Sequence, residues 1–209
     1  MPIDFVFPYG DEEEFIALAS KLGYSGLYFV YKYSKNTEYG EKIKKLIEKL
    51  QTKTEIKLYY GFIISFRDIN KVNKLKNLIF IESSDKNRFV IEKKKADVLF
   101  SLEKQAREDF MHHRASGLNH VLCELASKNN ITIGFSFNAI LKNNNQYKIL
   151  GRMMQNIFLC RKYKIKTLIG SFAEKPYEMR SFYDLSSLFF ILGMDKEQIK
   201  KSFGASIIK

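Results

Sequence analysis

Hydrophobic residues gather in seven short runs, separated by stretches in which apolar positions recur at helical spacing. Each run is apolar on nearly every position, which is typical of parallel strands that helices cover on both faces. The runs are residues 4–7, 26–31, 56–65, 78–83, 97–102, 131–137 and 167–172. We therefore expect seven buried strands that alternate with helices.

The segments between the runs carry helix signals. Residues 11–22 place acidic side chains in the first turn, an apolar stripe along one face and Gly23 just past the end. Residues 41–50 place four aliphatic side chains on one face and lysines outside it. Further helices are expected at 119–128, at 145–163, at 185–192 with Asp184 as its cap, and after Asp195, which with Gln198 resembles a capping box.

This alternation predicts an α/β fold of repeated βα units that closes like a barrel. A doubly wound open sheet is the alternative architecture. A chain of 209 residues suits one α/β barrel, and no linker or change of composition divides it. We therefore expect a single domain over residues 1–209.

The balance of charge narrows the class of partner. The 35 lysines and arginines exceed the 23 acids and give a formal net charge of +12. Such an excess favours a polyanion, either nucleic acid or an anionic membrane surface, over the simpler interpretation that lysines only solvate helices. Nucleic acid is preferred, because neither end of the chain shows a basic amphipathic helix or a lipidation signal.

The compartment is also suggested by the sequence. No apolar run is long enough to cross a bilayer, and residues 1–10 do not resemble a signal peptide. Cys123 and Cys160 lie within apolar helical patterns and have no metal-binding spacing. We expect a cytoplasmic protein with buried free thiols and no membrane partner.

Few residues suggest catalysis. The ends of the expected strands, where barrels carry their reactive groups, show no cluster of histidines or carboxylates. His112, His113 and His120 lie close together in sequence, but two adjacent imidazoles diverge and only two acids are near. We expect these histidines to make hydrogen bonds or to contact phosphates and not to bind a metal. Barrel phosphoesterases that use several metals carry a histidine pair in the first strand, and this chain has IDFVF there.

Arginines are more informative than lysines here, because only seven are present. Guanidinium groups bind phosphates through two hydrogen bonds and stack on exposed bases. Arg107, Arg114 and Arg180 are the favoured candidates for contact with RNA. The competing interpretation for each is a local salt bridge with Glu108, Asp109 or Asp184.

Two segments, residues 109–141 and 152–194, resemble protein component 3 of archaeal ribonuclease P, a member of the thirty-kilodalton subunit family. The resemblance is most specific in three motifs: R-x-S-G-x-N-H (114–120), N-x-x-L-C-R-K-Y-K (156–164) and E-M-R-S-x-x-D-L (178–185). The N-terminal half matches mainly through its rhythm of strands and helices and its opening IDFVFP.

The resemblance implies a TIM-barrel-like fold and a role in removing the 5′ leader from precursor tRNA. In this family the RNA subunit performs the cleavage with magnesium, so this chain would bind no cofactor or metal and would have no catalytic residue. Its partners would be the catalytic RNA, precursor tRNA indirectly, and other protein subunits, one of them as an obligate pair. The residues that would contact RNA are Arg88, Arg107, Arg114, Lys162 and Arg180.

Two other functions remain as alternatives. The chain could be a stand-alone metal-dependent phosphoesterase on the same barrel, or a scaffold that binds only protein.

Overall fold

The seven expected strands are all present in the computed structural model, which describes residues 2–71, 77–106, 108–109 and 111–203. Each strand pairs in parallel with the next one along the chain, in the order β1 to β7. They are β1 (Ile3–Val6), β2 (Gly26–Lys32), β3 (Lys57–Ile63), β4 (Ile79–Glu82), β5 (Val98–Phe100), β6 (Thr132–Ser136) and β7 (Thr167–Gly170). The prediction of parallel strands from doubly apolar runs is confirmed.

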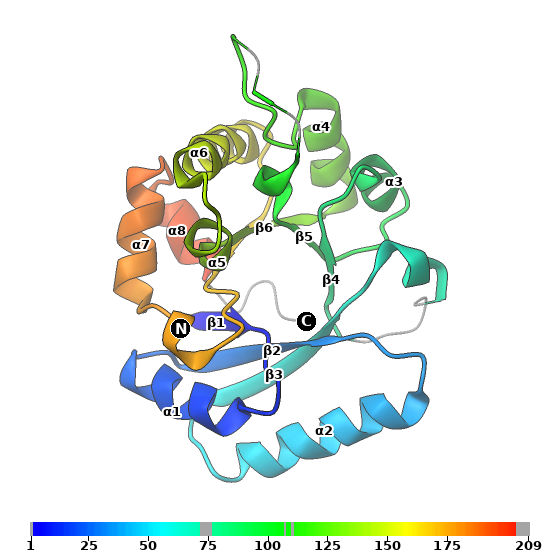
Figure 1. Cartoon of the computed structure of the whole chain (residues 1–209), viewed down its shortest axis with the longest axis vertical. Helices are drawn as coiled ribbons and strands as arrows, with labels where there is room; N and C mark the ends of the chain where they lie inside the picture. Colours follow the sequence, from blue (N-terminus) through cyan, green and yellow to red (C-terminus); the bar gives the residue numbers. More distant parts are fainter. Residues whose placement is uncertain (1, 72–76, 107, 110, 204–209) are drawn as a thin grey trace.

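The sheet curls into a nearly closed barrel, because β1 also lies beside the end of β7 (Figure 1). The amide of Phe172 donates to the carbonyl of Phe5, and the amide of Phe7 donates to the carbonyl of Ala173, both at 2.8 Å. These bonds continue the ladder across the seam between the first and last strands. The barrel interpretation is therefore confirmed, and the open doubly wound sheet is excluded.

A buried carboxylate reinforces this seam. Asp4 is fully buried, and its two oxygens accept hydrogen bonds from the amide of Ser171 at 2.6 Å and from the Ser171 hydroxyl at 2.7 Å. Burial raises the pKa of Asp4 to about 6, although the hydrogen bonds from Ser171 and Phe5 favour the ionised form. Asp4 thus ties the first strand to the segment that follows the last one.

Side chains fill the barrel interior, as in other closed α/β barrels. Strand residues alternate in direction, so Phe5 points inward while Val6 belongs to the outer layer that packs on the helices. The interior cluster consists of Ile3, Phe5, Tyr28, Val30, Leu78, Phe80, Val98, Phe100, Leu168 and Phe172. Gly61 makes room for one of these rings, because a Cβ there would lie 2.7 Å from the Tyr28 hydroxyl.

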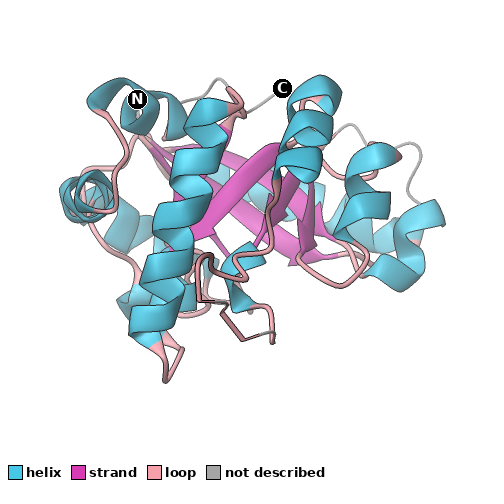
Figure 2. Ribbon diagram, turned by 90° about the horizontal axis from the view of Figure 1, so that it is seen from above, coloured by secondary structure: helices cyan, strands magenta, loops and turns pink. Residues whose placement is uncertain are grey.

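Helices form the outer layer and surround the strands (Figures 1 and 2). They are α1 (Glu12–Lys21), α2 (Thr37–Gln51), α3 (Asn87–Glu92), α4 (His120–Asn129), α5 (Phe137–Leu141), α6 (Gln146–Lys162), α7 (Phe182–Ile191) and α8 (Lys196–Ser202), with short 3-10 helices η1 (Phe66–Lys71), η2 (Leu102–Lys104) and η3 (Pro176–Glu178). All the expected helices are present. Helices α3 and α5 were not predicted, because they are too short to show a helical period.

The predicted cap of α7 was wrong. Ser181 is the N-cap: its extended backbone lets the hydroxyl accept from the amide of Asp184, and the helix begins at Phe182. Asp195 caps α8 as predicted, accepting from the amide of Gln198 at 2.8 Å. The capping box is incomplete, because the side-chain oxygen of Gln198 has no hydrogen-bond partner among the described residues.

Two further sequence predictions concern the cysteines and membrane-spanning helices. Cys123 and Cys160 are buried free thiols, as predicted. Among the described residues, no helix combines the length and the apolar character that crossing a bilayer requires.

Candidate nucleic-acid interface

The predicted RNA-contact residues divide between the two ends of the barrel. In a parallel barrel, loops that follow strands lie at one end, here called the mouth, and loops that precede strands lie at the other, here called the base. Arg88, Arg114 and Arg180 follow β4, β5 and β7 and belong to the mouth end. Lys162 is the last residue of α6 and belongs to the base. Arg107 lies outside the described residues, so its role stays a prediction.

A long loop between β5 and α4 carries Arg114 and is held against α6 by a buried arginine. The side chain of Arg152 is only 2 % exposed, and its Nε donates to Asp109 Oδ1 at 2.8 Å. Its Nη1 donates to the backbone carbonyls of Glu103 at 3.0 Å and Gln105 at 2.7 Å. This role of Arg152 was not predicted from the sequence, since an arginine within a helix is ordinarily solvent-exposed.

The following helical turn of α6 holds the second half of this loop. The Gln155 side chain accepts from the amide of Arg114 at 3.0 Å and donates to the Ser116 hydroxyl at 2.7 Å. Gly117 has φ +85°, and a Cβ there would lie 2.5 Å from the carbonyl oxygen of Leu102. The R-x-S-G-x-N-H motif is therefore largely structural, since its serine and glycine shape and anchor the loop.

Arg114 combines a structural contact with solvent exposure. Its Nη1 lies 3.3 Å from Asp109 Oδ2, so the predicted salt bridge is present, yet the side chain is 48 % exposed. Burial opposes the ionisation of Asp109, but hydrogen bonds from Arg152, Ala115 and Arg114 outweigh it and lower its pKa. The negative charge of Asp109 is thus shared by two arginines, and part of the Arg114 guanidinium still faces solvent.

The other two mouth-end arginines also have local partners. Arg88 pairs with Glu92 on α3 at 2.7 Å. Arg180 donates from Nη1 to the carbonyls of Tyr177 at 3.1 Å and Met179 at 2.7 Å. The competing salt bridge between Arg180 and Asp184 is not among the contacts of the described residues, since the Asp184 carboxylate accepts from the Ser181 hydroxyl at 2.8 Å.

At the base, lysines gather from loops that are distant in sequence. The loops at residues 52–57, 93–97, 128–131 and 162–166 contain nine lysines and two acids. We call these the basal lysine cluster: Lys53, Lys57, Lys93, Lys94, Lys95, Lys128, Lys162, Lys164 and Lys166. Three of the loops are adjacent, because the amide of Thr132 donates to the carbonyl of Asp97 and that of Ile133 to the carbonyl of Lys166, both at 2.9 Å.

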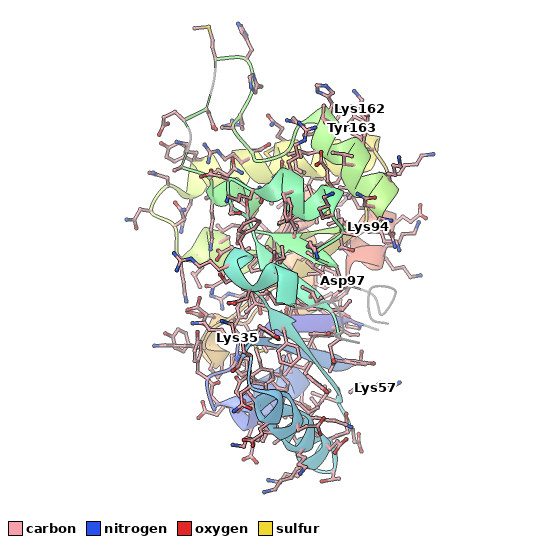
Figure 3. The ribbon with its side chains drawn as sticks, turned by 90° about the vertical axis from the view of Figure 1, so that its right-hand side faces the viewer. Lys35, Lys57, Lys94, Asp97, Lys162 and Tyr163 are labelled. Atoms are coloured by element: carbon pink, nitrogen blue, oxygen red, sulfur yellow. The ribbon has the colours of Figure 1, made fainter. Side chains whose placement is uncertain are left out.

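Figure 3 shows Lys57, Lys94 and Lys162 along the same side of the molecule. Not all of the cluster is unpaired, since Lys53 forms an ion pair with Glu13 at 2.7 Å. The Lys162 ammonium lies 5.5 Å from the centroid of the Tyr163 ring. Of this group, Lys162 alone was predicted from the sequence to contact RNA. The signal that could have identified the rest was position, because each lysine precedes an expected strand or begins it.

The three histidines are all exposed side chains. His112 and His113 are exposed in the loop before Arg114, and His120 is the first residue of α4. Among the described residues, no group of three histidines, cysteines or acids is arranged to hold a metal ion.

A second kind of surface covers α7 and α8. Tyr183, Phe190 and Ile191 are 77 %, 54 % and 75 % exposed, which is unusual for large apolar side chains on one helix. A groove of about 750 Å³ runs between the two helices and is lined by Phe182, Phe190, Ile199 and Phe203 among others. Among the described residues that line this groove, the charged ones are Lys196 and Lys200.

The comparisons with known proteins agree on one family. The family model described as RNase P subunit p30 matches residues 3–209. "Ribonuclease P protein component 3" of Methanococcus maripaludis strain S2 is 29 % identical over 83 % of this chain and 75 % of the relative. A chain from a cryo-EM structure of archaeal ribonuclease P with mature tRNA superposes with a TM-score of 0.75 at 25 % identity, covering 94 % of this chain and 84 % of that one.

A more distant solved structure shares the fold alone. Histidinol phosphate phosphatase of Lactococcus lactis superposes with a TM-score of 0.66 at 10 % identity, over 93 % of this chain and 94 % of the phosphatase. That structure was solved with zinc, L-histidinol and phosphate.

Proposed function

This chain belongs to the RNase P subunit p30 family, and we propose that, as a protein subunit of ribonuclease P, it binds the catalytic RNA through its basal lysine cluster. One observation carries the choice of surface: four loops at the base present nine lysines and only two acids. RNA phosphates provide the complementary array of charges. The proposed location is the cytoplasm, and the proposed organisation is one barrel over residues 1–209.

The mechanism is electrostatic. Lysine ammonium groups replace counterions condensed on RNA phosphates, and the release of those ions favours association. The strands hold the four loops in fixed relative positions, so little loop entropy is lost on binding. In this proposal the RNA subunit performs the cleavage of precursor tRNA with its own magnesium ions, and this chain holds no cofactor.

The mouth-end arginines are a secondary contact in this proposal. Arg88 and Arg114 are exposed but already paired with acids, so a phosphate must compete with Glu92 or Asp109. Arg180 is committed to two backbone carbonyls and lies 5.2 Å from the centroid of the Phe137 ring. We expect Arg114 to contribute more than the other two.

The exposed face of α7 suits a protein partner better than RNA. Protein interfaces are enriched in aromatic residues at their centre and depleted of charge there. Tyr183, Phe190 and Ile191 provide such a centre, and none of the three belongs to the basal lysine cluster. We propose that another protein subunit of the particle, paired obligately with this chain, covers this face.

Reconstitution of the particle tests the proposed RNA contact. Wild type and a Lys162→Glu, Lys166→Glu double variant are assembled with the catalytic RNA and the other subunits, and 5′ leader removal is measured. The variant is expected to need several-fold more protein for half-maximal cleavage. A Lys44→Glu, Lys45→Glu variant on the outer face of α2 carries the same change of charge as a control. Equal activity of the first variant and wild type would contradict the proposal.

The phosphoesterase alternative is tested separately. Its only support is the fold shared with a phosphatase, and the described residues show no group of three potential metal ligands. Purified chain is incubated with a phosphomonoester and added zinc or manganese. Hydrolysis that disappears in a His112→Ala, His113→Ala variant would favour this alternative.

A further inference from the structure

A cavity of about 590 Å³ opens at the mouth end of the barrel, within the size range of small-ligand sites. Its aromatic lining is extensive: Phe7, Tyr9, Tyr31, Tyr39, Phe100 and Phe172. Phe100 and Phe172 are buried and stack with ring centroids 5.0 Å apart, while Tyr9 is 68 % exposed. Aromatic walls of this kind suit a flat aromatic ligand, because stacking is favourable for any ring of matching size.

Cationic groups lie beside these aromatic side chains. Lys32, Lys42 and Lys104 line the cavity, and the Lys32 ammonium is 5.6 Å from the centroid of the Tyr9 ring. Lys104 is 3.6 Å from Glu82. Neither Lys32 nor Lys42 has an acidic partner within ion-pair distance in the described part of the chain. An anionic group attached to an aromatic ring would meet two available ammonium groups.

Each acid that lines the cavity has a partner, and Glu82 is the one paired with Lys104. The Glu12 carboxylate accepts from the Tyr31 hydroxyl at 3.1 Å, and Glu174 pairs with Lys142 at 2.7 Å. The cavity therefore does not repel an anion as strongly as its three carboxylates would suggest.

Two oxygens in the cavity wall lack hydrogen bonds. Asn138 Oδ1 and Ser101 Oγ are cut off from water and have no partner among the described residues. The orientation of the Asn138 amide is determined by its other contact: its Nδ2 donates to the carbonyl of Phe172 at 3.1 Å, and a carbonyl can only accept. A buried acceptor without a donor is costly, so a donor on a ligand would be favoured there.

We propose that the barrel mouth binds one unstacked nucleotide. The base lies against the aromatic side chains, an exocyclic amino group donates to Asn138 Oδ1, and the phosphate lies near Lys32 and Lys42. Ser101 and Asn138 both line the cavity, so the ligand reaches their buried oxygens after a side-chain adjustment of the kind common at binding sites. The nucleotide can be free or an unpaired residue of an RNA chain.

This site is at the opposite end of the barrel from the basal lysine cluster. It adds recognition of a nucleobase to a protein whose proposed RNA contact is otherwise made only to phosphates. The two proposals can fail independently, because the mouth site is tested with mononucleotides on the isolated chain and the basal lysine cluster is tested with RNA.

Calorimetric titration of the purified chain provides the test, with AMP, CMP, UMP, ribose 5-phosphate and a short unstructured RNA as probes. AMP and CMP are expected to bind several-fold more tightly than UMP, which has no exocyclic amino group, and at least roughly tenfold more tightly than ribose 5-phosphate, which has no base. Binding of the RNA in competition with AMP indicates that the site takes a nucleotide within a chain. AMP binding without competition indicates a site for free nucleotides.

Three variants locate the binding. Tyr9→Ala and Lys32→Met should each weaken AMP binding about fivefold or more, and both residues are exposed, so the fold is unaffected. Ser101→Ala should weaken binding while raising the thermal stability of the free protein, because it removes an unpaired buried oxygen. Lys57→Met, at the base, is the matched control and should leave AMP binding unchanged.

The proposal is overturned if AMP does not bind at millimolar concentration. It is also overturned if ribose 5-phosphate binds as tightly as AMP, or if Lys57→Met weakens AMP binding more than Lys32→Met does.

Discussion

The Arg152 guanidinium and the Asp109 carboxylate meet at 2.8 Å beneath the surface, joining α6 to the loop that follows β5. The same guanidinium also satisfies two carbonyls of that loop, so one side chain determines the path of several residues. Arg114, which shares Asp109, is therefore held in position by a contact in which the Arg152 side chain is buried and the Asp109 side chain is 20 % exposed.

Loss of this contact should destabilise the protein strongly. In Arg152→Met the volume is nearly kept, but the carbonyls of Glu103 and Gln105 lose this donor, and Asp109 keeps only its hydrogen bonds from Ala115 and Arg114. Leaving a buried acceptor without its donor costs about 1–3 kcal/mol, and two carbonyls lose theirs here, so the free energy of unfolding in urea should fall by about 3 kcal/mol or more. Arg161→Met is the matched control, since Arg161 is exposed and its side chain donates to the carbonyl of Gly193 at 3.1 Å. A loss below about 1 kcal/mol in Arg152→Met would contradict this account.

Stability should depend on pH through Glu103. Burial raises the pKa of Glu103 from 4.5 to about 7, and neither carboxylate oxygen has a hydrogen-bond partner among the described residues. The folded state therefore holds a proton that the unfolded state has already released between pH 4.5 and 7. Stability contributed by this group is present below pH 4.5, falls as the pH rises to about 7, and stays lost above it.

The variant Glu103→Gln removes this titration. At pH 8 it should be more stable than wild type, by at most about 3 kcal/mol, and the difference should shrink toward pH 5. Chemical denaturation at several pH values measures the difference. Glu48→Gln, on the exposed face of α2, controls for the loss of a negative charge and should show no such trend. A constant difference between Glu103→Gln and wild type across this range would refute the assignment.

The salt dependence of RNA affinity should report the number of basal contacts. Each lysine that contacts a phosphate adds about 0.7 to 0.9 to the slope of log affinity against log salt. In Lys162→Met, Lys166→Met the slope should be shallower by about 1 to 2, while Lys44→Met should leave it unchanged. Binding measured by filter retention from low to moderate salt gives both slopes. Equal slopes in wild type and the double variant would show that these lysines do not touch RNA.

The exposed face of α7 should be required for pairing with a protein subunit. Ile191→Asp places a charge at the centre of the proposed interface, where desolvation would be costly. Co-purification with the other protein subunits should be lost while the thermal unfolding of the isolated chain is nearly unchanged, because the side chain is exposed. Glu48→Lys, on α2, is a surface control. Retained pairing in Ile191→Asp would assign this face another role.

The sequence by itself determined the architecture. The seven apolar runs predict the seven strands because a parallel strand under helices needs apolar side chains on both faces, which leaves a local signature. Caps such as Asp195 are equally local, because they depend on residues three positions apart. The cap of α7 was misassigned only because Ser181 and Asp184 both suit that role and their backbone geometry decides between them.

Only the tertiary structure decided which side chains act together. Arg152 is buried where it pairs with Asp109, which lies 43 positions earlier in the chain. The helical pattern around Arg152 gives no information about such a distant partner. The basal lysines form a cluster only because parallel closure brings the starts of distant strands to one end of the barrel. Likewise, the unpaired oxygens of Ser101 and Asn138 come from different strand ends. Such contacts join residues that are distant in sequence, and these residues come together only when the chain folds. A local sequence pattern therefore cannot identify them.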